Sequence, residues 1–469
     1  MAELALREYL WVGIGVLLIV AWAVQQLFFT IRYPSNLPRI GGEPRFSLRT
    51  RWRFHTDARG LFKEVYDNYS KKGKTVLVPG YGFHDDIILP ASALRWLQRQ
   101  PERLAWKDID LTPTIRMIVA QAATRFTLGG SPTGRKLCYD KGYLKACLDI
   151  SDALVISAGL SGASPKLLRP ILGRLGSISA KRQIRGLEKY FEPVYRERIR
   201  MLEEGVAESD AKMPEDHLQM MLRFGLSERR DEALSLHDMT KRLCIANFGS
   251  MHQTSIQIVN MLLNIIDSDE EFDTVSVLRE EVAQIVGDNK ASGWTKARVA
   301  AMTRADSVAR ETLRLHSFTS RGVVRKVVSD GVVTEDGIAL PKGSSVSFIA
   351  YWLQTDGDVF ENPFKFDPFR FSRAREAEMD EQGKPGLANM SFVSTGTQNL
   401  AFSHGKHACP GRFLVDFELK MVIAYVLMNY DIEFLPEYNG KRPENRWLAD
   451  AYFPPKDVKI RVRRKERAG

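Results

Sequence analysis

The chain has 469 residues, of which 44% are hydrophobic and 26% are charged, and its formal net charge is +10. This is the composition of a globular protein rather than a disordered one, and the length allows one large domain or two smaller ones. The positive charge would suit nucleic acid, an anionic membrane surface or an acidic protein partner, although such a surplus is most often solvated surface. Because no block of Lys and Arg is interleaved with aromatic residues, we do not expect nucleic acid as a partner.

The chain begins with an apolar segment. Residues 9–29, YLWVGIGVLLIVAWAVQQLFF, carry no formal charge and match the roughly 20 residues that a helix needs to cross a bilayer. A cleaved signal peptide is the alternative, but the run is long, Glu3 and Glu8 offset Arg7, and no small-residue cleavage site follows. Several arginines follow the run, and cationic flanks tend to remain cytosolic. We therefore expect residues 1–32 to be a retained anchor and the bulk of the chain to face the cytosol.

A short hinge is expected after the anchor. In residues 33–44, Pro34 and Pro38 restrict the backbone, and Gly41 and Gly42 free it again. No repeat, low-complexity tract or second linker follows. The simplest division places one large domain at residues 45–469.

The body of the chain is predicted to be mostly helical. Ser235 and Asp238 resemble a capping box, and the following run is apolar nearly all round, as in a helix buried through the middle of a domain. A second helix is expected around residues 296–315, where Glu311 and Arg314 stand three apart and share a face. Taken alone, this pair could be an exposed ion pair, which contributes about 0–1 kcal/mol.

The pattern changes after Arg314. Residues 321–352 contain β-branched runs broken by Asp-Gly and Pro-Lys-Gly turn signals, which predict a small β-sheet. The stretch NPFKFDPFRF then predicts an irregular but well-ordered loop. A last long helix is expected to begin near Pro410.

Cys409 thus lies just before a helix start, in the stretch LAFSHGKHACPGRFLVDFELK. The dipole and free N–H groups at a helix start stabilise negative charge, so a cysteine there is biased toward the thiolate. Such a thiolate could be a nucleophile with His404 or His407 as its base, a zinc ligand, or the axial ligand of haem iron. The four cysteines show no CxxC spacing, which argues against a disulfide framework or a structural zinc site. A single thiolate suffices for haem, whereas zinc would need further ligands.

Three stretches resemble the motifs of one family. FSHGKHACPG, residues 402–411, fills every fixed position of F-x-x-G-x-x-x-C-x-G, the haem signature of the cytochrome P450 family. ETLR at residues 311–314 matches that family's E-x-x-R, and FDPFRF resembles its P-E-R-F loop with Phe369 in place of the acid. The three occur in the family's order. The sequence is most similar to fungal membrane-anchored members of terpenoid secondary metabolism.

The resemblance implies a mainly α cytochrome P450 fold, a helical haem domain with small β-sheets preceded by one transmembrane helix. It makes Cys409 the thiolate ligand of haem b, with Phe402 packed beside the sulfur. Gly405 and Gly411 would permit the tight cysteine loop, and His407 would bond a haem propionate.

Four further residues follow from the same resemblance. Arg325 is similar to the strand arginine that meets a propionate, although this match is looser. Glu311, Arg314 and Arg370 would form a buried triad that locks the cysteine loop onto the domain. Breaking such a buried network can cost several kcal/mol, so the triad would be structural.

The oxygen-activating groove of the long helix departs from the family. The stretch GSMHQT puts His252 where an acid is expected, Gln253 where the first Thr is expected, and Thr254 next. In one interpretation His252 is a core histidine bonded to a neighbouring carbonyl. In the other, His252 and Thr254 are catalytic and relay protons to bound dioxygen, since an imidazole pKa near 6.5 suits proton exchange.

A second departure concerns the front half of the chain. The family's W-x-x-x-R helix, whose Arg meets a propionate, has no counterpart between about residues 90 and 135. We expect a shortened or missing helix there, as a skipped exon in the gene model would produce. Its loss would weaken haem retention and the basic surface that docks the reductase.

Together these features predict a monooxygenase that oxidises a lipophilic small molecule, with a terpenoid favoured. The resemblance implies O2 and electrons from NADPH delivered by a cytochrome P450 reductase, with cytochrome b5 as a further candidate partner, at the endoplasmic reticulum membrane. Phe248, Phe318 and Thr319 are the expected pocket residues. Two alternatives stay open: a reductase-independent haem-thiolate isomerase or dehydratase, and a haem-poor, non-catalytic membrane protein.

Overall fold

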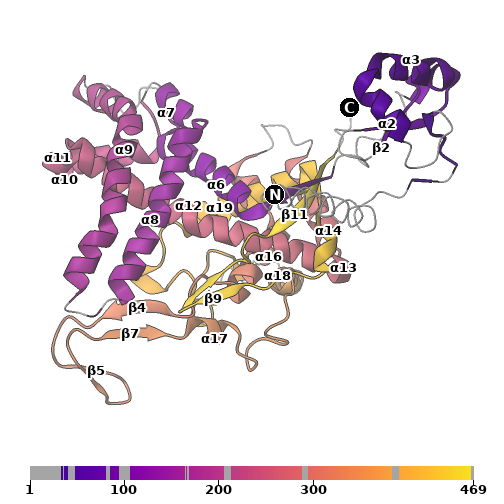
Figure 1. Cartoon of the computed structure of the whole chain (residues 1–469). Helices are drawn as coiled ribbons and strands as arrows, with labels where there is room; N and C mark the ends of the chain where they lie inside the picture. Colours follow the sequence, from indigo (N-terminus) through magenta and orange to yellow (C-terminus); the bar gives the residue numbers. More distant parts are fainter. Residues whose placement is uncertain are drawn as a thin grey trace, which may run out of the picture. The chain divides into compact units, whose positions relative to one another are not determined.

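The structure is a computed structural model that describes residues 33–34, 36–40, 48–80, 85–93, 106–163, 165, 168–204, 213–287, 294–382 and 390–465. The chain divides into two compact units, Met1–Ala105 and Trp106–Gly469 (Figure 1). This division falls inside the domain predicted at residues 45–469, in the stretch that lacks the expected Trp-x-x-x-Arg helix.

The predicted membrane anchor, residues 1–32, lies outside the described residues, as do residues 41–44 of the predicted hinge. Within the part of the chain that the structure describes, no helix combines the length and apolarity needed to span a bilayer. The anchor therefore stays a prediction.

In the described residues of the first unit, two helices pack with a two-stranded antiparallel sheet. The side chain of Asp57 caps the second helix by accepting a hydrogen bond from the backbone amide of Gly60 at 3.0 Å. Leu61 and Val65 of that helix are buried together with Val76 of the sheet. The elements are α2 (Leu48–Thr56), α3 (Ala58–Asn68), β1 (Val76–Pro79) and β2 (Asp85–Ile88), with short turns η2 (Ser70–Lys72) and η4 (Ala91–Ala93).

The second unit is mainly helical, as predicted. Its longer helices are α6 (Leu111–Leu128), α8 (Lys141–Ala163), α9 (Arg169–Glu203), α10 (His217–Glu228), α12 (Leu236–Asp267), α14 (Thr274–Val286), α16 (Thr303–Leu315), α18 (Arg370–Gln382) and α19 (Arg412–Asn429). Its short helices are α7 (Pro132–Leu137), α11 (Arg230–Ala233), α13 (Asp269–Phe272), α15 (Lys296–Ala300) and α17 (Ala350–Gln354).

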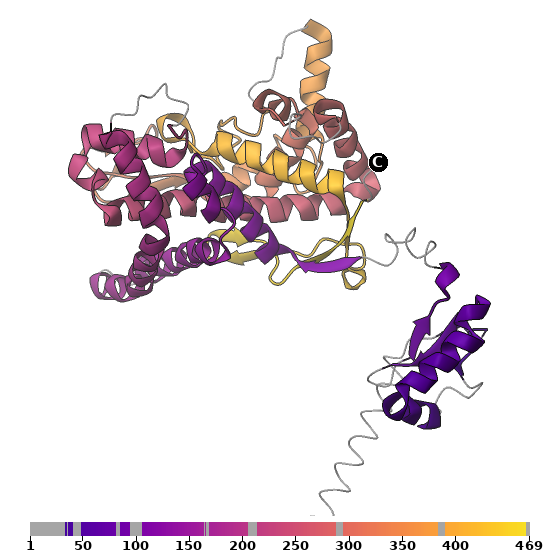
Figure 2. The same cartoon turned by 90° about the horizontal axis from the view of Figure 1, so that it is seen from above.

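The central element of this unit is α12. Its N-cap is Ser235, whose hydroxyl accepts a hydrogen bond from the backbone amide of Asp238 at 3.2 Å, so the predicted helix start is confirmed. Helices α6, α8, α9, α16 and α19 all contact it. Figure 2 shows α19 running beside α12. The prediction that this helix is buried through the middle of a domain is confirmed, because its residues 254–265 are buried without interruption.

Small sheets complete the second unit. The strands are β3 (Lys107–Asp110), β4 (Gly322–Lys326), β5 (Val332–Val333), β6 (Ala339–Leu340), β7 (Ser345–Phe348), β8 (Tyr430–Phe434), β9 (Arg446–Leu448), β10 (Ala451–Phe453) and β11 (Lys459–Arg464). β11 lies between β3 and β8, and the pairs β4–β7, β5–β6 and β9–β10 are antiparallel. The β-sheet predicted after Arg314 is therefore confirmed.

Two predicted helix boundaries differ from the structure. The helix expected around residues 296–315 is two helices, α15 and α16, separated by Ala301 and Met302. The helix expected near Pro410 begins at Arg412, with Gly411 as its N-cap. Cys409 thus lies two residues before the N-cap.

Candidate active site

The loop that carries Cys409 folds back on itself. The backbone amide of Cys409 donates a hydrogen bond to the carbonyl of Phe402 at 2.8 Å, across the turn η7 (Gly405–His407). Gly405 has a φ of 71°, in the left-handed region that favours glycine. A Cβ at Gly411 would lie 3.8 Å from Cys409 Sγ, an ordinary contact, so the predicted need for glycine at that position depends on what binds the sulfur.

Cys409 opens onto a cavity of about 360 Å³ in the second unit. Of the predicted site residues, Phe402 and His407 line this cavity together with Cys409. The remaining lining residues are Gly249, Gln253, Gln257, Leu313, Ser317, Phe318, Thr319, Arg321, Ala350, Leu400, Ala401, Ser403 and Val415. The cysteine loop, α12 and the segment after α16 therefore meet at one place.

The arginine at the cavity is not the one predicted. Arg325 does not line the cavity, and its Nη1 donates to the neighbouring carbonyl of Val324 at 2.9 Å. Arg321 lines the cavity and forms an ion pair with Asp450 at 2.7 Å. Both arginines carry the positive charge that would pair with a propionate, but Arg321 lines the Cys409 cavity and Arg325 does not.

The face of α12 that meets the cavity consists of Gly249, Gln253 and Gln257. These residues are spaced by four, so they form one strip along the helix. His252 and Thr254, the predicted catalytic pair, do not line this cavity. Once the rotation of the helix about its axis is known, counting in fours from Gly249 identifies Gln253 from the sequence as a residue that faces the cavity.

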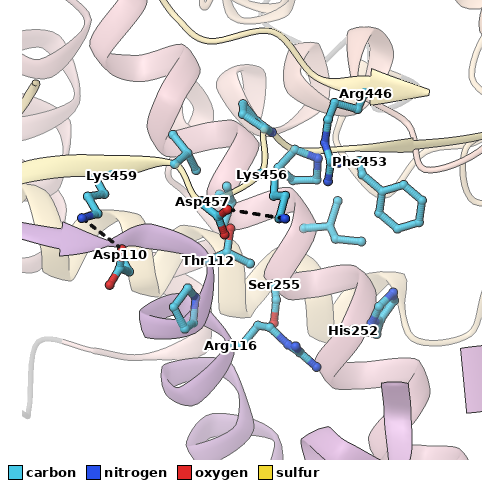
Figure 3. A pocket seen from close by; sticks show the side chains of 16 residues that line it. Asp110, Thr112, Arg116, His252, Ser255, Arg446, Phe453, Lys456, Asp457 and Lys459 are labelled. Atoms are coloured by element: carbon cyan, nitrogen blue, oxygen red, sulfur yellow. Dashed lines mark ion pairs between the residues drawn. The ribbon is translucent and has the colours of Figure 1, made fainter. Parts of the chain in front are cut away.

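His252 is turned toward a second cavity of about 640 Å³ (Figure 3). Its ring stacks on Phe248 at 5.7 Å between centroids and meets Phe318 edge-on at 6.1 Å. Its buried Nε2 has no hydrogen-bond partner among the described residues, so the carbonyl bond expected of a core histidine is not seen at that atom. Burial, reinforced by Arg116, lowers the pKa of His252, and Asp152 opposes that shift. The ring is therefore neutral at neutral pH.

The second cavity lies between α12, the start of α6 and the segment from β9 to β11. Figure 3 shows Arg116 of α6 near His252 and Ser255 of α12. It also shows two ion pairs, one between Lys459 and Asp110 and one between Lys456 and Asp457. Arg116 is itself paired with Asp152 at 2.6 Å. These paired charges give the cavity a polar rim.

Of the predicted pocket residues, Phe318 and Thr319 line the Cys409 cavity. Phe248 does not line it, and instead packs on His252. Thr254 is fully buried, and its hydroxyl finds no hydrogen-bond partner within the described residues.

The structure brings Glu311, Arg314 and Arg370 together in one network. Arg314 Nε and Nη2 donate to the two carboxylate oxygens of Glu311 at 2.7 Å each, and Arg370 Nε donates to Glu311 Oε1 at 3.2 Å. The side chains of Glu311 and Arg314 are 0% and 3% exposed, which rules out the surface ion pair. Arg314 Nη1 also donates to the carbonyl of Gln354 at 2.9 Å.

A second buried network was not predicted from the sequence. Lys420 of α19 pairs with Asp306 of α16 at 2.7 Å and with Asp416 at 2.8 Å. Asp306 also accepts from Arg375 at 3.0 Å and from the backbone amide of Phe392 at 2.9 Å. This network ties the helix that follows Cys409 to α16.

The residues at the cavity fit a haem held through one sulfur. Among the residues described, no group of three or more His, Cys, Asp or Glu side chains could hold a metal ion. A single thiolate suffices as an axial haem ligand. Ser403 Oγ at the cavity is buried and has no hydrogen-bond partner among the described residues, which is the pattern expected where a bound group belongs.

The comparisons with known proteins agree with this fit. Residues 93–462 match the family model described as Cytochrome P450. The chain is 44% identical to cytochrome P450 monooxygenase pbrC of Penicillium brasilianum and to astC of Aspergillus terreus, each over 95% of both chains. It is 37% identical to tenB of Beauveria bassiana over 92% of both chains. The resemblance to fungal members of the family is confirmed.

The relatives are longer inside the aligned region. The alignment with the Penicillium protein covers 515 positions, whereas this chain has 469 residues, so at least 46 positions (515 less 469) hold residues that this chain lacks. This excess is larger than one average helix of about 11–12 residues.

Members of the matched family bind haem b and receive electrons from NAD(P)H through a reductase. The family match covers well over half of the chain, and the folded cysteine loop brings Cys409 to the wall of a cavity. The chain therefore belongs to the cytochrome P450 family and is a haem-dependent monooxygenase.

Proposed function

We propose that this monooxygenase oxidises a C–H bond of a lipophilic secondary metabolite, with a terpenoid favoured, using O2 and electrons that a reductase delivers from NADPH. The observation that carries the proposal is the cavity shared by Cys409 and the strip of α12. The lining supports a lipophilic substrate, because side chains such as Leu313, Phe318 and Val415 offer hydrocarbon surface.

The residues at the cavity then have distinct proposed roles. The thiolate of Cys409 would hold the haem iron, and Phe402 would pack beside the sulfur. His407 and Arg321 would supply positive charge or hydrogen bonds to the carboxylates of the haem, with Arg325 as the alternative arginine. When bound, the haem supplies the activation of dioxygen and the transfer of one oxygen atom.

His252 and Thr254 remain our candidates for moving protons toward the cavity. His252 Nε2 has no hydrogen-bond partner within the described residues, so this nitrogen is free to join a proton relay, and the lowered pKa means that the ring would hold a proton only briefly. Because neither side chain lines the Cys409 cavity, a proton from them would need a further carrier, such as a water molecule, to reach it.

We further propose that residues 1–32 anchor the enzyme in the endoplasmic reticulum membrane with its catalytic part in the cytosol. The proposal rests on the uncharged run at residues 9–29 and the arginines that follow it. In that position, the cytochrome P450 reductase and cytochrome b5 are the expected electron partners. Fractionation of cells that express the full chain and a variant lacking residues 1–32 tests this, because only the full chain should pellet with membranes after an alkaline wash.

Expression in a host that carries a reductase tests the proposed activity. Cells fed candidate terpenes should release a product heavier by one oxygen atom, and Cys409→Ser should abolish it. If isotopic oxygen from O2 does not enter the product, the monooxygenase proposal is wrong.

One observation favours a second candidate, a reductase-independent isomerase or dehydratase. The α12 side chains that line the cavity are the carboxamides of Gln253 and Gln257, which offer no hydroxyl or acid for proton delivery. Substrate turnover without NADPH and reductase would decide for this candidate.

A further inference from the structure

The strip of α12 at the Cys409 cavity contains two carboxamides one helical turn apart. Gly249 stands at one end, and apart from the backbone of its own helix no described heavy atom lies within 4 Å of where a Cβ would stand, so this end of the strip is open. Gln253 and Gln257 follow at intervals of four residues and both line the cavity. Side chains at this spacing are neighbours on a helix, close enough for two long polar side chains to meet.

The orientation of the Gln257 amide is fixed by its partner. Its Nε2 donates to the backbone carbonyl of His316 at 3.0 Å, and a carbonyl oxygen can only accept. Gln257 Oε1 must therefore point the other way. It is buried and has no hydrogen-bond partner among the described residues, although an acceptor left unpaired inside a protein costs about 1–3 kcal/mol.

The two amides are not hydrogen-bonded to each other in the structure, but Gln253, one helical turn away, can satisfy this oxygen by turning its side chain. No hydrogen bond of its own amide is found within the described part of the chain, so the amide is available. If Gln253 Nε2 donates to Gln257 Oε1, then Gln253 Oε1 is left as a hydrogen-bond acceptor for the contents of the cavity. An amide neither gains nor loses a proton at neutral pH, so the group can hold a partner but cannot relay protons.

We propose that Gln253 is a positioning residue: anchored through Gln257 to the carbonyl of His316, it presents an acceptor oxygen to an O–H donor in the Cys409 cavity. The donor is a water molecule or a hydroxyl of the substrate, and in the second case the enzyme prefers substrates that already carry a hydroxyl group. This inference rests on the proposed function, because it needs a haem on Cys409.

The carbon monoxide complex of the reduced haem-loaded protein tests the orientation. A negative partial charge near the oxygen end of bound carbon monoxide raises its C–O stretching frequency, and a positive one lowers the frequency. Gln253→Met keeps the length of the side chain but removes its dipole, so the frequency should fall relative to wild type. Gln257→Met should split or broaden the band, because it frees the Gln253 amide to turn.

Ser250→Ala is the matched control on the same helix. Ser250 does not line the cavity, and its hydroxyl donates to the carbonyl of Ala246 at 2.9 Å, so this variant should keep the wild-type frequency. A rise of the frequency in Gln253→Met would mean that the N–H side faces the cavity, and no change would mean that the amide does not face it. Either result overturns the proposal.

The two sources of the donor are separated by a pair of probes, borneol and bornane, titrated into the ferric protein and followed by its absorption spectrum. If the donor is a substrate hydroxyl, wild type should bind borneol more tightly than bornane. In Gln253→Met this preference should be roughly threefold to tenfold smaller, which is the effect of one hydrogen bond. If the preference is unchanged while the carbon monoxide shift occurs, the donor is water. Failure of wild type to form any thiolate-type carbon monoxide band would refute the proposed function itself, and this inference with it.

Discussion

The side-chain oxygen of Gln354 accepts a hydrogen bond from the backbone amide of Leu400 at 3.0 Å. Leu400 lies two residues before Phe402, whose carbonyl accepts from Cys409. Gln354 also donates from Nε2 to the carbonyl of Arg314 at 3.2 Å, and its own carbonyl accepts from the Arg314 guanidinium. Gln354 therefore links the buried Glu311–Arg314 pair to the base of the cysteine loop.

Replacing this link should loosen the loop. Gln354 is fully buried, so Gln354→Leu would leave the Leu400 amide and the Arg314 carbonyl unpaired, at a cost of about 1–3 kcal/mol for each group. We expect a lower free energy of unfolding in urea and a lower haem content after purification. The same substitution at exposed Gln398 is the matched control and should change the free energy of unfolding by less than about 0.5 kcal/mol. Equal stability of the two variants would contradict the linking role.

Removing one member of the buried Glu311–Arg314 ion pair should lower the free energy of unfolding more than replacing Gln354 does. In Glu311→Gln, the fully buried guanidinium of Arg314 loses its counter-charge, and breaking such a pair costs about 3–5 kcal/mol. Chemical denaturation or the yield of soluble protein measures the loss. The exposed pair of Arg196 with Glu192 offers the comparison, since Arg196→Ala should leave stability nearly unchanged. A loss no larger in Glu311→Gln than in Arg196→Ala would mean that the pair is not needed for folding.

Glu418 of α19 should make stability depend on pH. Its two carboxylate oxygens have no hydrogen-bond partner in the described part of the chain, and burial raises the pKa of Glu418 to about 8. The folded protein then holds this proton more tightly than the unfolded chain, so stability is lost as the pH rises from about 4.5 to about 8. Glu418→Gln cannot ionise, and it should stabilise the protein at pH 8 by up to about 4 kcal/mol relative to its effect at pH 4.5.

Urea denaturation at the two pH values gives this comparison for Glu418. Exposed Glu437→Gln provides the baseline for an isosteric change at the surface. If Glu418→Gln shifts the free energy of unfolding equally at both pH values, the side chain is not buried as the structure places it.

Restoring the residues that the relatives carry should improve haem retention. The relatives hold at least 46 aligned positions that this chain lacks (515 less 469), and the sequence predicts the loss between about residues 90 and 135. A chimera with the Penicillium segment inserted before Trp106 should bind more haem per chain than the chain of 469 residues. Sequencing of the transcript across this region is the companion measurement: an uninterrupted message that matches this sequence would remove the skipped-exon explanation.

The sequence predicted the parts of the molecule that depend on local signals. The Ser235 cap, the buried course of α12 and the sheet after Arg314 all follow from residues close together in the chain. The break between α15 and α16 was missed, because Ala301 and Met302 carry no helix-stopping residue such as Gly or Pro.

The parts that were missed depend on contacts between distant segments. Gln354 reaches Leu400 across 46 residues, and Lys420 reaches Asp306 across 114, so no spacing pattern reveals either pair. Which side chain of the stretch GSMHQT faces Cys409 depends on the rotation of α12 about its axis. Packing by α6, α8 and α19 sets that rotation, and the motif alone does not.

The most direct test of the account is the absorption spectrum of reduced membranes containing the full chain, exposed to carbon monoxide. A haem held by the Cys409 thiolate predicts a red-shifted Soret band in wild type and its loss in Cys409→Ser, with the protein still present on an immunoblot. Absence of the band in wild type, or its persistence in Cys409→Ser, would contradict the assignment of Cys409 as the haem ligand.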